Sequence, residues 1–323
     1  MAATTVLVGI DEAGYGPVLG PLVVSATAFE VPTERADTCL WDLLQRSVSR
    51  TASARDSRIA VLDSKKLYRR KEGLARLERS VLSAVGAWRG VPPSLRGLLN
   101  LLCPDLPAML SEYPWYRDSN PALPTAADAG GIRIAAGLLA RDFDAQSVRP
   151  AGCWSVVLPE GHYNRLVTNT QNKAVVLSGL TLRLVQRVAD AYPDRELCIR
   201  IDKQGARQHY SRLLLRAFED RRLKVLEESD QHSAYELVNG RGRWRISFSQ
   251  SGESLHMPVA LASLVSKYVR ELLMDCFNAY WAGQVPDIKP TAGYYQDGLR
   301  FLRDIQPHLQ RLGIARDHLM RQR

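Results

Sequence analysis

The stretch VGIDEAGYGPVLGPLVVSA, residues 8–26, places two adjacent carboxylates inside an otherwise apolar run. Asp11 and Glu12 close a β-rich segment, and three glycines and two prolines follow before the chain returns to apolar residues. Buried like charges are costly unless a cation or hydrogen bonds compensate for them. The stretch therefore predicts a hairpin of buried strands, with a functional pair of acids beside a turn that needs glycine.

The composition is that of an ordinary globular protein. Of the 323 residues, 46% are hydrophobic and 24% are charged. No apolar segment reaches the length of a membrane span, and the N-terminal run lacks the basic start of a signal peptide. Five widely separated cysteines form neither a disulfide framework nor a zinc-ligand spacing, so we expect a reducing cytoplasmic location. The net charge of +9 is compatible with a polyanionic partner such as nucleic acid.

Alternating strand and helix patterns predict an α/β fold, in which helices pack on a mixed sheet. Apolar runs at 5–10, 22–29 and 196–202 indicate buried strands, and two long helices are expected over 172–192 and 258–281. These helices carry broad apolar faces, as helices that cover a sheet do.

Residues 90–150 differ in composition from the rest of the chain, because this region contains many prolines between short apolar segments. We interpret the region as an insertion or accessory lobe. The expected organisation is therefore a first part of the main domain over 1–89, the inserted lobe over 90–150, and the second part over 151–323.

Two further acids stand where apolar segments end. Asp202 closes the strand LCIRID, and Glu253 lies between a strand pattern and the second long helix. Together with Asp11 and Glu12, these acids would form an oxygen-only site for a hard cation, Mg²⁺ or Mn²⁺. Such a site suits two-metal phosphoryl chemistry, with the ions roughly 4 Å apart. Each acid alone can also be a solvated strand end or helix cap, and for Asp202 or Glu253 in isolation that is the better interpretation.

The opening stretch resembles the opening motif of the type 2 ribonucleases H (ribonuclease HII), G-[IV]-D-E-A-G-R-G-P-x-x-G-P-[LV]-V. Further matches follow in the same order along the chain. LDSKKL, residues 62–67, resembles the family's D-S-K-K-L, and IRID, residues 199–202, resembles the strand that carries its third acid. Residues 252–271 are similar to its fourth-acid segment and the following helix, which places Glu253 at that acid. AGYYQDGLRFL, residues 292–302, resembles its K-G-Y-G segment.

This resemblance implies a ribonuclease H-like mixed sheet and a metal-dependent endonuclease. Such an enzyme cleaves the RNA strand of an RNA–DNA hybrid, or a ribonucleotide embedded in duplex DNA. By the same resemblance, the catalytic residues and the ligands of Mg²⁺ or Mn²⁺ would be Asp11, Glu12, Asp202 and Glu253. The sequence indicates no membrane partner and identifies no protein partner.

The resemblance also implies contacts with the substrate. The Gly-Tyr-Gly turn would set backbone groups against the ribose 2′-hydroxyl, one tyrosine would stack near the sugar, and two lysines would meet phosphates. A solvated turn is the alternative for the lysines. The residues concerned are Gly14, Tyr15, Gly16, Lys65, Lys66 and Tyr294.

The chain departs from the family pattern at several positions. Tyr15 stands where the family has arginine, so a cationic phosphate contact is lost there. Glu253 stands where the family has aspartate and is one methylene longer, which affects the geometry that Mg²⁺ demands. Tyr295 replaces a glycine, and the family histidine after this motif is missing.

Three functions remain open at this point. The first is a divergent, active ribonuclease HII-like enzyme, and the second is a related nuclease with altered substrate choice. The third is a nucleic-acid-binding protein on the same fold that has lost catalysis. An acid at all four positions favours the first two, because a degenerate enzyme more often carries alanine, asparagine or serine at one of them.

Overall fold

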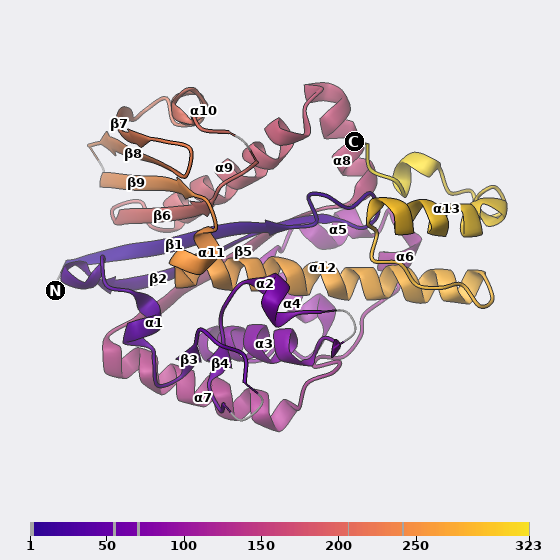
Figure 1. Ribbon diagram of the computed structural model, residues 1–323, viewed down its shortest axis with the longest axis horizontal. Helices are drawn as coiled ribbons and strands as arrows, with labels where there is room; N and C mark the ends of the chain where they lie inside the picture. The colour runs from indigo at the N-terminus through magenta and orange to yellow at the C-terminus, as the bar shows by residue number, and fades with distance from the viewer. Residues whose placement is uncertain (1–2, 54–55, 70–71, 206, 241, 323) are drawn as a thin grey trace.

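A mixed seven-stranded sheet runs through the middle of the molecule, and helices cover both of its faces (Figure 1). The predicted α/β class is therefore confirmed. The sheet order is β5-β2-β1-β6-β9-β8-β7, and a separate short pair is formed by β3 and β4. The computed structural model describes residues 3–53, 56–69, 72–205, 207–240 and 242–322.

The strands of the main sheet are β1 (Thr4–Ala13), β2 (Leu22–Pro32), β5 (Arg149–Leu158), β6 (Glu196–Asp202), β7 (Arg222–Glu228), β8 (His232–Asn239) and β9 (Gly242–Ser249). The short pair consists of β3 (Val48–Ser49) and β4 (Ile59–Ala60).

The α-helices are α1 (Leu40–Leu43), α2 (Ser64–Leu67), α3 (Ala75–Arg89), α4 (Leu95–Leu102), α5 (Leu106–Leu110), α6 (Pro114–Arg117), α7 (Ala129–Gln146), α8 (Glu160–Thr170), α9 (Lys173–Ala191), α10 (Ser211–Ala217), α11 (Gly252–Leu255), α12 (Met257–Gln284) and α13 (Tyr295–Leu309). Short 3₁₀ helices span Thr33–Arg35 and Arg316–His318. None of the described helices combines the length and apolar composition that a membrane crossing requires.

Strand β1 lies in the interior of the sheet, between β2 and β6. It pairs antiparallel with β2, as the hairpin pattern predicts, and parallel with β6. Its side chains alternate between the two faces of the sheet. Leu7 packs into the core under α12, whereas Val8 and Ile10 pack into the second core under α9. Burial on both faces explains why the strand is almost uniformly apolar up to its acids.

The two long helices form as the apolar spacing predicts. Helix α9 begins at Lys173, where the side chain of Asn172 accepts hydrogen bonds from the first amides of the helix. Helix α12 begins at Met257 with Pro258 in its first turn, where the missing N–H is not needed. The two helices lie on opposite faces of the sheet (Figure 1).

The proline-rich region folds into helices α4, α5, α6 and α7. Its apolar residues share one core with the rest of the chain: Leu98, Trp115 and Ile132 belong to the same buried cluster as Leu264 of α12. The region therefore packs against the face of the sheet that α12 covers. The domain boundaries at 90 and 150 stay a prediction.

Two helical patterns in the sequence form helices only in part. The pattern over 37–49 predicts a helix, but only Leu40–Leu43 is helical and the segment ends in strand β3. The pattern from about 69 to 88 also predicts a helix, which begins at Ala75; residues 70 and 71 lie outside the described part. No strand is predicted over 232–239, where strand β8 forms.

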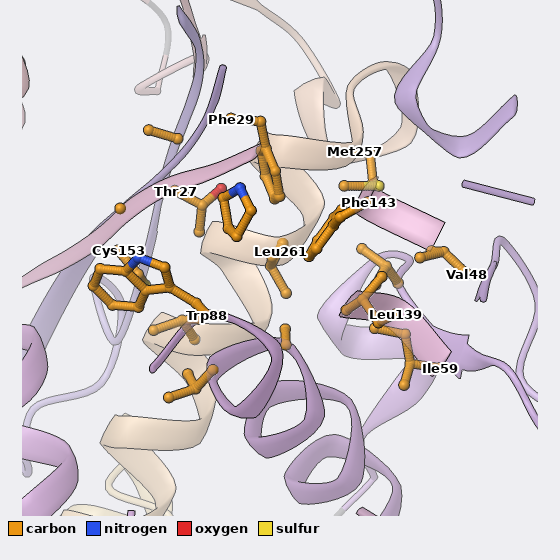
Figure 2. A pocket seen from close by; sticks show the side chains of 17 residues that line it. Thr27, Phe29, Val48, Ile59, Trp88, Leu139, Phe143, Cys153, Met257 and Leu261 are labelled. Carbon is orange, nitrogen blue, oxygen red and sulfur yellow. The ribbon is translucent and has the colours of Figure 1, made fainter. Parts of the chain in front are cut away.

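A small cavity of about 40 Å³ lies between the sheet and helices α3, α7 and α12. Figure 2 shows the rings of Phe29 and Phe143 and the side chain of Leu261 around it. Its lining is almost wholly apolar and contains no acid, so water finds few partners there. We interpret the cavity as a packing gap of the core.

Helix α12 approaches β1 so closely that only glycine fits at one position. A Cβ atom on Gly9 would lie 2.1 Å from the backbone carbon of Pro258. We predict that Gly9→Ala lowers the free energy of unfolding by more than about 2 kcal/mol, because neither backbone can yield without moving a core element.

Urea unfolding of this variant tests the close approach. Gly179→Ala is the matched control, because no atom lies within 4 Å of the added Cβ on this helical residue. The control should keep or raise stability by up to about 1 kcal/mol. Equal stability of the two variants would contradict the predicted contact.

Candidate active site

Asp11 lies near the end of β1 with its side chain 7% exposed, facing α12. One of its carboxylate oxygens, Oδ1, accepts a hydrogen bond of 2.7 Å from the Glu12 amide. The hydroxyl of Ser263 also contacts the carboxyl, and the Ser266 hydroxyl donates to the Asp11 carbonyl at 3.0 Å. Burial and the neighbouring Glu12 raise the pKa of Asp11 well above its usual value.

Asp202 reaches the same place from β6. Ile10 pairs with Ile201 in the parallel register of β1 and β6, so the next residue of each strand, Asp11 and Asp202, lie side by side. The Gly252 amide donates to Asp202 Oδ1 at 2.7 Å. Burial, followed by the charges of Asp11 and Glu253, raises the pKa of Asp202 to about 8.

Glu253 is supplied by the short helix α11, immediately before α12. Its carboxyl contacts that of Asp202, and it adds charge repulsion to Asp11 and Glu12. Its Oε2 atom is buried and has no hydrogen-bond partner among the described residues. A buried carboxylate oxygen without a donor is costly, so this atom points to a missing positive partner.

Glu12 completes the group. Burial, and then the charge of Asp202, raises the pKa of Glu12 to about 7, while the charge of Lys65 acts in the opposite direction. The structure thus brings together all four acids that the sequence singled out, from β1, β6 and α11. We call Asp11, Glu12, Asp202 and Glu253 the acidic cluster.

The donor set of the acidic cluster fits a hard divalent cation. The acidic side chains of the cluster offer only carboxylate oxygens, the kind of ligand atom that Mg²⁺ and Mn²⁺ prefer. Among the residues that the structure describes, no three His, Cys, Asp or Glu side chains are already arranged to hold a metal ion. Like-charged carboxylates keep apart unless a proton or a cation lies between them. A cation bound among these carboxyls would lower their raised pKa values, and it would give the unpartnered oxygen of Glu253 a positive partner.

The turn Gly14-Tyr15-Gly16, which we call the glycine turn, follows Asp11 and Glu12 closely in the sequence. Gly14 has a φ of +91°, and a Cβ there would lie 2.6 Å from the Pro21 carbonyl oxygen. Gly16 is exposed, and a Cβ there would meet no atom within 4 Å. The first glycine is therefore required by the fold, whereas the second leaves open space beside the site.

The residues predicted to contact the substrate differ in how they are placed relative to the acidic cluster. Lys65 and Lys66 are both exposed on α2, and the charge of Lys65 favours the ionised form of Glu12. Tyr294 is 55% exposed. None of the interactions found among the described residues joins Tyr294 to the acidic cluster, but the neighbouring Gly293 carbonyl accepts a 2.8 Å hydrogen bond from Val18, next to the glycine turn.

Sequence reasoning missed two cations beside Tyr15. The ammonium of Lys173 lies 5.3 Å from the centre of the Tyr15 ring, and Arg207 interacts electrostatically with its hydroxyl. Lys173 is the first residue of α9, and Arg207 lies in the loop before α10. The only available signal was the start of a helix after Asn172, which does not reveal that the side chain faces the turn.

Comparison with known proteins gives structural neighbours only. No family model and no curated protein matches the chain. The chain is similar to RNase HII from Archaeoglobus fulgidus, solved in complex with PCNA, with 15% identity and a TM-score of 0.48 over 98% of this chain and 94% of that one.

Two more neighbours carry related descriptions. A Bst-RNase HIII structure in complex with Mn²⁺ is 16% identical with a TM-score of 0.46, over 99% of this chain and 67% of that one. Ribonuclease H2 from Pyrococcus horikoshii OT3 is 12% identical with a TM-score of 0.45, over 97% and 92%.

The crowded acids predict a pH dependence of stability. The folded pKa of Asp202 is about 8 and that of Glu12 about 7, both above their ordinary values, so the folded chain binds more protons than the unfolded chain in this window. We expect the metal-free protein to lose stability as the pH rises from about 4 to 8.

Thermal unfolding in the presence of a chelator measures this loss. Comparison with Asp202→Asn isolates the cluster, because the amide carries no charge and the variant should lose less stability over the same range. A wild-type curve that stays parallel to that of the variant would contradict the prediction.

Proposed function

We propose that this chain is a metal-dependent endonuclease of the ribonuclease H type, which hydrolyses RNA within an RNA–DNA hybrid or a ribonucleotide embedded in duplex DNA. The observation that carries the proposal is the convergence of the acidic cluster, from β1, β6 and α11, beside an open glycine turn. The motif resemblance at residues 8–26 supports the same activity.

Asp11, Glu12, Asp202 and Glu253 are the groups that would hold Mg²⁺ or Mn²⁺. When bound, two such ions supply an activated water and stabilise the leaving oxygen of the phosphodiester. The protein keeps Asp11 in place through Ser263 and the Glu12 amide, and it keeps Asp202 in place through the Gly252 amide. These hydrogen bonds orient two of the four carboxyl groups before a cation enters.

The glycine turn would distinguish ribose from deoxyribose. Neither the Tyr15 amide nor the Gly16 amide donates a hydrogen bond to another residue within the described ranges. Exposed backbone donors beside the acidic cluster suit a 2′-hydroxyl, which both donates and accepts hydrogen bonds. The open space over Gly16 allows the sugar to approach the backbone closely.

Cations around the site suit the phosphates of the substrate. Lys65 is exposed close enough to Glu12 to affect its ionisation, and Lys173 lies over the Tyr15 ring. Lys173 and Arg207 stand beside the tyrosine that replaces the family arginine, and we propose that they take over its phosphate contact.

Removal of one metal ligand tests the activity. We predict that Asp11→Asn reduces cleavage by at least about 10³-fold, because a neutral amide cannot hold the cation in place, while binding of nucleic acid persists. The assay uses a duplex with a single ribonucleotide and an RNA–DNA hybrid, each in Mg²⁺ and separately in Mn²⁺. Asp144→Asn, an exposed acid of α7, is the control and should keep wild-type activity.

The outcomes separate the three functions. Cleavage of neither ribonucleotide substrate by the wild-type protein, with binding intact, would indicate a non-catalytic binding protein. Cleavage of all-DNA duplex only would indicate a nuclease of different specificity. Unchanged cleavage by Asp11→Asn would remove this residue from the mechanism.

The open space over Gly16 generates a second test. We predict that Gly16→Ala leaves the melting temperature unchanged but raises KM for the single-ribonucleotide duplex about tenfold, because the methyl group occupies the path of the sugar. Gly137→Ala in α7 also adds a methyl group into open space; it should leave KM unchanged and keep or slightly raise the melting temperature, as expected for alanine inside a helix. An unaltered KM for Gly16→Ala would argue against ribose contact at this turn.

A further inference from the structure

A buried arginine lies beneath the glycine turn. Arg321 is 2% exposed, and one nitrogen of its guanidinium, Nη2, donates to the carbonyls of both Gly14 and Pro17. The Arg321 amide donates to the Val18 carbonyl at 2.8 Å. The amides of Tyr15 and Gly16, which lie between these two carbonyls in the sequence, donate to no other residue in the described ranges.

Three other segments hold the continuation of the turn. The Gly20 amide donates to Glu160 at 3.0 Å, and Arg270 of α12 donates to the Leu19 carbonyl at 3.2 Å. The Gly293 carbonyl accepts from both the Val18 and Leu19 amides. The path of the turn is thus set by residues that are far apart in the sequence.

The segment that carries Arg321 is itself anchored. Asn164 of α8 donates to the carbonyls of Asp317 and Met320, each at 2.8 Å, and accepts a hydrogen bond of 2.8 Å from the Gln322 amide. The C-terminal end of the chain accordingly lies beside α8 (Figure 1). Arg321 therefore enters the turn from a fixed backbone.

The charge of Arg321 is only partly satisfied. The Nε and Nη1 atoms of Arg321 have no hydrogen-bond partner among the described residues, and burial together with the charge of Arg270 lowers the pKa of Arg321 to about 10. The guanidinium carbon lies 4.9 Å from the centre of the Tyr163 ring, and the buried Glu160 attracts the charge. An apolar side chain of similar volume often stabilises such a site better than a partly satisfied charge does. What the guanidinium adds at the turn itself is a pair of hydrogen bonds to two carbonyls.

We propose that Arg321 is a positioning residue that gives the proposed active site its preference for ribose. Its guanidinium fixes the carbonyls of Gly14 and Pro17, and the amides between them are thereby directed at the 2′-hydroxyl. The inference rests on the proposed function, because it assumes that this turn reads the sugar. Without Arg321 the acidic cluster persists, but the turn no longer presents its amides in one orientation.

The test measures affinity in an Asp11→Asn background, where the substrate is not consumed. Fluorescence anisotropy compares a duplex containing one ribonucleotide with the all-DNA duplex of the same sequence, in Mg²⁺. We expect Arg321→Met to reduce the affinity ratio of the two duplexes by about tenfold, the effect of losing a hydrogen bond to a charged donor. The affinity for the all-DNA duplex should stay unchanged.

Controls separate positioning from folding. Arg303→Met, at an exposed position of α13, should leave both affinities unchanged. Arg321→Lys keeps the charge without the planar fork and should reduce the ratio as well, which preserves the test if the methionine variant unfolds. Hydrogen exchange of the segment 14–20 should be faster in both Arg321 variants.

Two results would overturn the inference in different ways. An unchanged affinity ratio, or an equal loss of affinity for both duplexes, would leave Arg321 with a structural role only. If Asp11→Asn with Arg321 intact shows no preference for the ribonucleotide, the turn does not read the sugar and the positioning role fails with that part of the proposed function. Cleavage of the two ribonucleotide substrates by the wild-type protein decides separately whether the proposed activity stands.

Discussion

The parallel pairing of β1 with β6, under the tight contact of α12, is the constraint on which the rest of the structure depends. It aligns the ends of two buried strands, so that Asp11 and Asp202 meet without a loop to place them. Because Gly9 lets the first turn of α12 rest on the strand backbone, Ser263 and Ser266 of this helix reach Asp11. A site held by central elements is more rigid than one built on loops.

The acidic cluster is electrostatically unfavourable in the absence of a cation. Four carboxyls share a partly buried place, and burial rather than repulsion is the largest cause of the raised pKa values of Asp11, Glu12 and Asp202. A protein that only needed stability would replace one of them with a neutral residue. Their joint presence makes sense when a divalent ion provides the compensating charge.

The sequence sufficed for those parts of the fold and site that follow from local patterns. Apolar runs that end in acids located β1 and β6, and helical spacing located α9 and α12. Residues 90–150 were harder, because helices α4, α5 and α6 are short and gain stability mainly from the shared core. Lys173 and Arg321 carried no local signal, since their importance comes from neighbours that lie far away in the chain.

The anchoring of the glycine turn has a consequence for biosynthesis. Asp11, Asp202 and Glu253 all precede Arg321 in the order of synthesis. The guanidinium that steadies the turn arrives only with residue 321. The path of the turn near the N-terminal end of the chain is therefore completed only after almost the whole printed sequence has been made.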